Sequence, residues 1–177
     1  MRTLAIGALL VVATAISASA AEDGPPPEAK AFDRFFDEAQ PTCAYQPSGD
    51  CVDLGFSYAD RDGDGRLTPE ELNLVRNDFG SWAQWKSPEM TKKERTSIAI
   101  GHYAVQAIGL KNFVEAYDAD GDGALTQEEL LTDITLDQRP LGQVLQDPNA
   151  VDWVTLQQRL GPAAPFIGAL GAAAQEQ

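Results

Sequence analysis

Basic residues are scarce in this sequence. Lysine and arginine together number 13, against 27 aspartates and glutamates, which gives the 177 residues a formal net charge of −14 at pH 7. A protein of this charge repels nucleic acid and anionic membranes, so we expect neither as a partner. The acidity favours a cation as the ligand.

Histidine occurs once, and the usual signatures of catalysis are missing. His102 lies among alanine and isoleucine residues, where an imidazole more commonly belongs to the packing or the surface than to a site. The sequence contains no Ser/His/Asp arrangement, no phosphate-binding loop and no zinc-ligand spacing. We therefore expect no catalytic residues, no residues that bind an organic cofactor, and a protein that is not an enzyme.

The apolar run near the start is too short to span a membrane. Residues 4–16 follow Arg2 and lead to the small residues Ala18-Ser19-Ala20, whereas a membrane-spanning helix needs about 20 apolar residues. This combination is typical of a secretory signal peptide that is cleaved after Ala20. We therefore predict a bacterial-type signal peptide at residues 1–20, a periplasmic or secreted protein, and no membrane span after cleavage.

Cysteine is limited to Cys43 and Cys51. Their spacing is not CxxC and no histidine is near them, so a catalytic or metal-binding thiol pair is the weaker interpretation. An even pair in an exported chain is typical of a disulfide, and the intervening Pro-Ser-Gly favours a turn. We predict a bridge that stabilises the fold by roughly 2–4 kcal/mol.

Acidic residues, in contrast, gather in two matching segments. Residues 60–71 read DRDGDGRLTPEE and residues 118–129 read DADGDGALTQEE, with acids at positions 1, 3, 5 and 12, glycine at 6 and leucine at 8. Two like charges ~4 Å apart repel by about 4 kcal/mol at an effective dielectric of ~20, so such a loop is favourable only around a cation. Calcium takes ~6–8 oxygens in a flexible shell, which this pattern can provide.

Apolar residues flank both segments at helical spacing. The positions eight, four and one residues before each loop are apolar, namely Val52, Phe56 and Ala59 in the first case and Leu110, Val114 and Tyr117 in the second. Leu72 and Val75 follow the first loop, and Leu130 and Ile134 follow the second. Each acidic loop is therefore predicted to lie between two amphipathic helices.

With the pattern D-x-D-x-D-G-x-L-T-x-x-E between helices, the chain resembles the EF-hand superfamily over residues 52–76 and 110–134. The resemblance implies an all-α fold, a paired EF-hand lobe with additional flanking helices and a short β-bridge that joins the loops through Leu67 and Leu125. It also implies two Ca²⁺ ions. The expected ligands are Asp60, Asp62, Asp64, the Arg66 carbonyl, Thr68 through a water, Glu71, Asp118, Asp120, Asp122, the Ala124 carbonyl, Thr126 through a water, and Glu129.

The segments between the two hands are divided by glycine and aromatic residues. Within an EF-hand domain that spans residues 43–136, the first exit helix is expected to end at Gly80. The following SWAQWKSPEM is expected to be irregular, with Trp82 and Trp85 as anchors. A single long helix over residues 91–117 is then predicted from an apolar stripe at three- and four-residue steps.

The outer segments are expected to play supporting roles. Residues 21–42 are predicted to form a flexible, proline-rich lead-in and a short helix, AFDRFFDEA, whose phenylalanines cover the core. Residues 137–160 are predicted to form a helical extension, a vestigial hand at most, that binds no calcium because paired acids are missing. Residues 161–177 form an apolar tail.

Other ions fit the loops less well. Magnesium prefers small octahedral shells and keeps its waters. Lanthanide-selective proteins of the superfamily tend to carry proline at loop position 2, where this chain has Arg61 and Ala119. Calcium therefore remains the expected ion.

Two functions stay open for such a protein. The first is a calcium-binding protein whose ions order the helices and present a surface to a partner. The second is a periplasmic sensor that exposes a dedicated surface on loading. Apart from Met1 in the signal peptide, Met90 is the single methionine and lies outside both hands. The methionine-rich groove of a promiscuous sensor is therefore not expected.

Overall fold

The computed structural model describes residues 24–161, without the side chains at 97, 100, 101, 103–105, 107 and 108. The predicted signal peptide, and all but the first residue of the predicted apolar tail, lie outside this range. The described chain forms eight helices: α1 (Pro27–Tyr45), α2 (Ser48–Ala59), α3 (Pro69–Lys86), α4 (Lys92–Ile108), α5 (Leu110–Tyr117), α6 (Gln127–Leu130), α7 (Leu141–Val144) and α8 (Trp153–Leu160). The predicted all-α class is confirmed.

Helix α1 is longer than the short helix expected there. It begins at Pro27, where proline suits the first turn because that position needs no backbone N–H donor. Helix α1 continues through Pro41 to Tyr45 and lies against α3 and α2. The expectation of a flexible lead-in as far as residue 30 is thus wrong from Pro27 onward, because the prolines start the helix rather than prevent it.

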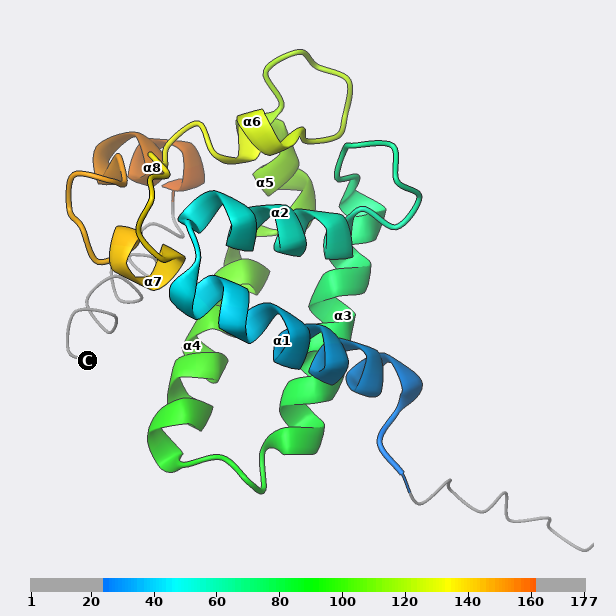
Figure 1. The fold of residues 1–177 in the computed structure, drawn as a ribbon. Coiled ribbons are helices and arrows are strands. Elements are labelled where there is room, and N and C mark those ends of the chain that lie inside the picture. The colour runs from blue at the N-terminus through cyan, green and yellow to red at the C-terminus, as the bar shows by residue number, and fades with distance from the viewer. Residues whose placement is uncertain (1–23, 162–177) are drawn as a thin grey trace, which may run out of the picture.

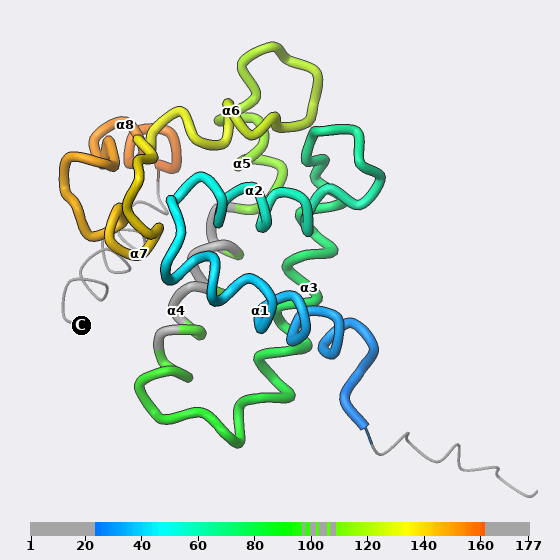
Figure 2. Tube along the Cα trace, viewed as in Figure 1, coloured from blue at the N-terminus to red at the C-terminus, as the bar shows by residue number. Residues whose placement is uncertain are grey.

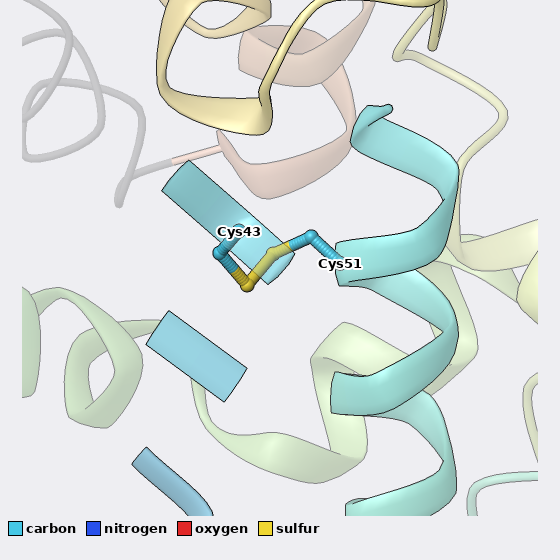
Figure 3. Close-up of a disulfide and its surroundings, with 2 residues drawn as sticks. All are labelled: Cys43 and Cys51. Carbon is cyan, nitrogen blue, oxygen red and sulfur yellow. A yellow bond between two sulfur atoms is a disulfide. The ribbon is translucent and has the colours of Figure 1, made fainter. Parts of the chain in front are cut away.

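A disulfide joins the ends of the first two helices, as predicted. Cys43 on α1 and Cys51 on α2 are bonded, with their Cα atoms 4.6 Å apart (Figure 3). Pro47 lies in the turn between the helices, immediately before Ser48, which begins α2. The disulfide therefore holds α1 beside α2, the helix that leads into the first acidic loop.

Helix α3 does not end at Gly80, and this expectation is wrong. The helix continues to Lys86 because Trp82 is buried against Phe32 and Ala29 in an aromatic core. The Trp82 indole N–H also donates to Asp33 Oδ1 at 2.8 Å. Glycine inside a helix costs roughly 0.5–1 kcal/mol relative to alanine, a penalty that burial of a tryptophan exceeds.

The predicted single helix over residues 91–117 is two helices, α4 and α5. Gly109 separates them with a φ of +75°, a backbone conformation that other residues adopt rarely. Helix α4 forms the return arm of a hairpin with α3, and the connecting turn lies at the end of the molecule away from the acidic loops (Figure 2). Ile100, Tyr103 and Ala107, which belong to the predicted apolar stripe, are among the side chains outside the description.

Two cores support the fold. One contains Phe32, Trp82 and Ala29, with further aromatic rings from α1, α2 and α3 packed around them. The other lies directly beneath the acidic loops and consists of Ala59, Leu67, Val114, Tyr117, Leu125 and Leu160. Leu72 and Val75 of α3 pack against this second core, which therefore ties both loops to α2, α3, α5 and α8.

The C-terminal segment differs from a regular exit helix. Helix α6 has only four residues, so Ile134, expected on an exit helix, lies beyond it and pairs with Val151 in an isolated antiparallel bridge. Helix α8 then packs against α5, and its Leu160 joins the core beneath the loops. Residues 137–160 contain the helices α7 and α8, and α8 contributes to the core of the lobe.

The described helices offer no membrane-crossing segment, since none is both long enough and apolar enough.

The burial of Leu125 leads to a test of the core beneath the loops. Leu125 is fully buried, so Leu125→Ala should lower the free energy of unfolding by about 2–5 kcal/mol through lost packing and a cavity. Leu74→Ala is the matched control because Leu74 is 48% exposed, and it should change stability by less than about 1 kcal/mol. Urea denaturation in the presence of a chelator measures both, and equal losses would contradict this account of the core.

Candidate metal centres

The first carboxylate of each loop organises the backbone around it. Asp60 follows α2 and accepts hydrogen bonds from the backbone N–H groups of Gly63 at 2.7 Å and Gly65 at 2.8 Å. Asp118 follows α5 and accepts from Gly121 at 2.7 Å and Gly123 at 2.9 Å. The two loops therefore repeat one local conformation, as their sequences predict.

The sixth position of each loop requires glycine. Gly65 has a φ of +83° and Gly123 a φ of +88°. A Cβ added at either residue would meet no atom within 4 Å, so the constraint is the backbone conformation and not the space. A residue with a side chain at position 6 would therefore strain the backbone of the loop.

The glutamate at position 12 closes each loop from the following helix. In the first loop, Glu71 Oε1 accepts from the Arg61 N–H at 2.8 Å, and Glu71 Oε2 accepts from the Thr68 N–H at 2.9 Å. Glu129 is held in the same way by Ala119 and Thr126, with 2.8 Å in both bonds. Thr68 and Thr126 in turn accept from the glutamate N–H, which completes a capping box at the start of α3 and of α6.

These hydrogen bonds keep both glutamates ionised. Bonds from the Thr126 N–H and hydroxyl and from the Ala119 N–H lower the pKa of Glu129 to about 2. Burial acts to raise the pKa of Glu71, but the bonds from Thr68 and Arg61 outweigh it, and the net pKa is lowered. Both side chains are therefore charged near neutral pH, as a ligand for a hard cation must be.

Three of the four predicted carboxylates in each loop come together. Oxygens of Asp60, Asp62 and Glu71 lie within 4.8 Å of one another. The same holds for the second loop, through the carboxylates of Asp118, Asp120 and Glu129. Such oxygen-only sets match the donor preference of calcium, so the residues present fit the ion.

The carboxylates at position 5 lie outside these groups of three. Asp64 Oδ1 accepts from the Arg66 N–H at 2.8 Å, and Asp122 Oδ1 accepts from the Ala124 N–H at 2.9 Å. Asp122 Oδ2 also forms an ion pair with the Arg66 guanidinium. The remaining ligands stay predictions. They are the carboxylates of Asp64 and Asp122, the carbonyls of Arg66 and Ala124, and, through water, Thr68 and Thr126.

The loops meet through the predicted β-bridge. The Leu67 N–H donates to the Leu125 carbonyl at 2.8 Å, and the Leu125 N–H donates to the Leu67 carbonyl at 2.9 Å. Figure 1 shows the two loops side by side at one end of the molecule, after α2 and after α5. The bridge therefore makes one paired lobe from two segments that are far apart in the sequence.

A polar contact beneath the second loop was not predicted from the sequence. The Tyr117 hydroxyl donates to Asp133 Oδ2 at 2.9 Å, and Arg159 Nε lies 3.5 Å from the same oxygen. Burial, and then the bond to Asp133, raise the pKa of Tyr117. No local pattern links these three residues, since they come from α5, the turn after α6, and α8.

Comparison with known protein families agrees with this geometry. A family model described as EF hand matches residues 52–75 and 115–134, which contain both loops and parts of their flanking helices. The two matched regions are consistent with an EF-hand superfamily protein that carries two hands. These domains indicate calcium binding. Comparisons with curated proteins and with solved structures gave no match.

The short helix α6 makes its capping box testable. Because α6 has one turn, removal of the Thr126 hydroxyl by Thr126→Ala should lower the free energy of unfolding by about 0.5–2 kcal/mol. Thr126→Ser keeps the hydroxyl and should retain most of the stability. Both variants are compared by thermal unfolding in chelator, so that any effect on a bound ion is removed. An equal loss in both would assign the effect to the threonine methyl group and not to the cap.

Proposed function

We propose that this chain is an exported, non-enzymatic calcium-binding protein whose two ions order the paired lobe and the surface it presents to a partner. The observation that carries the proposal is the duplicated set of three carboxylates, each within 4.8 Å and supported by matching hydrogen bonds. The ions would be held by the twelve predicted ligands, six from each loop. Calcium is preferred over magnesium because the loops offer many flexible oxygen donors.

Ordering by the ion follows from the charge of the loops. Without a cation, carboxylates at these separations repel one another, and the repulsion weakens when an ion lies between them. An ion that binds only the folded state stabilises it by about 2.7 kcal/mol per site when its concentration is ~100 times Kd. Extracellular calcium modules work at Kd values of ~10⁻⁴–10⁻³ M, so such sites stay filled where calcium is abundant.

Export is supported by two features of the chain. Residues 1–20 have the pattern of a signal peptide. The Cys43–Cys51 disulfide fits an oxidising compartment, since such bonds are rare in the cytosol. We therefore propose a periplasmic or secreted location for the mature protein.

The partner surface is supported by a cavity between α3 and α4. It has a volume of about 440 Å³ and is lined in part by Phe79, Ala83, Met90 and Ile98. Helix α3 begins at Pro69, within the first acidic loop, and its second half lines the cavity from Phe79 onward. An ion that orders this loop therefore also fixes the start of the helix that forms one cavity wall.

Calcium titration calorimetry tests the binding function. The wild-type protein should bind two ions, and Glu71→Gln and Glu129→Gln should each abolish one event, because each glutamate closes its own loop. Glu70→Gln and Glu128→Gln are matched controls that remove the same charge one residue earlier, outside the hydrogen-bonded groups. No heat at millimolar calcium in the wild type would refute the proposal.

An environment-sensitive apolar dye separates ordering from sensing. In a protein that calcium orders, dye fluorescence should fall on loading, because the core beneath the loops becomes better packed. A calcium-induced rise, abolished in the Glu71→Gln/Glu129→Gln double variant, would instead establish a sensor that exposes its surface.

A further inference from the structure

Arg66 connects the first loop to a predicted ligand of the second. It occupies position 7 of the first loop, next to Leu67 in the β-bridge. Its guanidinium forms an ion pair with Asp122 Oδ2, at position 5 of the second loop. Because Arg66 lies next to the bridge, its positively charged side chain, which belongs to the first predicted metal centre, reaches a carboxylate of the second.

This contact has no counterpart in the opposite direction. The position in the second loop that corresponds to Arg66 is Ala124, which carries no charge and is buried. Asp64, the counterpart of Asp122, therefore receives no ion pair from that position. Although the hydrogen bonds of the two loops match closely, their electrostatic surroundings differ, and the difference falls on the second loop.

We propose that Arg66 is a positioning residue that lowers the calcium affinity of the second loop, an inference that rests on the proposed function. With no ion bound, the guanidinium offsets the negative charge of Asp122 and so stabilises the calcium-free lobe. With an ion bound, the same guanidinium lies close to a divalent cation and repels it. Both effects stabilise the calcium-free second loop relative to its calcium-bound form. A contact changes the affinity for an ion only when it stabilises these two forms unequally.

The same residue also couples the two centres. The backbone carbonyl of Arg66 is a predicted ligand of the first ion, whereas its side chain contacts a predicted ligand of the second. Filling of the first loop therefore fixes the backbone from which the guanidinium reaches Asp122. The two loops are expected to bind with different affinities even though their ligands are alike.

The test uses variants in which the first loop is silenced. Calorimetry compares Glu71→Gln with Glu71→Gln/Arg66→Ala and with Glu71→Gln/Arg61→Ala. Arg61 is the matched control because it lies in the same loop but pairs with Asp78 at 2.6 Å, away from the second loop. Removal of Arg66 should tighten binding at the second loop by about three- to tenfold at low salt, with a smaller gain at high salt. Removal of Arg61 should change binding by less than about twofold.

The outcomes separate this inference from the proposed function. Equal gains for the two arginine variants, or no gain for Arg66→Ala, would overturn the role of Arg66 while calcium binding stands. Absence of binding in the wild type would overturn both. A second readout is thermal unfolding in the presence of a chelator. Arg66→Ala in the otherwise wild-type protein should lower the midpoint temperature of unfolding. In an Asp122→Asn background, where the ion pair is already lost, Arg66→Ala should leave the midpoint unchanged. A similar drop in both backgrounds would show a structural role unrelated to the ion pair.

Discussion

The antiparallel bridge between Leu67 and Leu125 is the contact on which the lobe depends. Two backbone hydrogen bonds of 2.8 and 2.9 Å join the loops there, and both leucine side chains enter the core below. Because each leucine lies between the acidic half of its loop and the capping threonine, the bridge fixes both halves at once. The carboxylates, the entering helices and the start of α3 and α6 are all placed relative to this pair of residues.

The sequence was sufficient wherever a short pattern determines the structure. The loops and their glycines follow from residue types at fixed spacing, and the bridge follows from the EF-hand resemblance that this spacing carries. The Cys43–Cys51 disulfide follows from an even cysteine pair with turn residues between them. Helix boundaries were less predictable, because a glycine is compatible with either outcome. Gly80 lies inside α3, where buried Trp82 keeps the helix intact, while Gly109 adopts positive φ and separates α4 from α5. Only the tertiary packing distinguishes the two.

The second hand shows where local patterns fail. Its sequence suggests a regular exit helix, but α6 ends after one turn and Ile134 pairs with Val151 instead. Helix α8 compensates by placing Leu160 in the core and Arg159 beside Asp133. The contacts of α8 join residues more than twenty positions apart in the sequence, so a short sequence pattern does not reveal them. The C-terminal extension is thus part of the second hand's support and not a separate appendage.

The two hands lie far apart in the sequence, and this separation affects how much the segment between them can change. Leu67 and Leu125 are 125 − 67 = 58 positions apart, and the intervening chain contains the whole α3–α4 hairpin and α5. The entropy of closing a flexible loop rises only logarithmically with length, by about 0.6 kcal/mol for each doubling. A change in the length of this segment therefore adds little entropic cost to the pairing of the loops, whereas the part of α3 around Trp82 is held by the aromatic core. The surface of this segment can therefore change in sequence while the paired acidic loops keep their geometry.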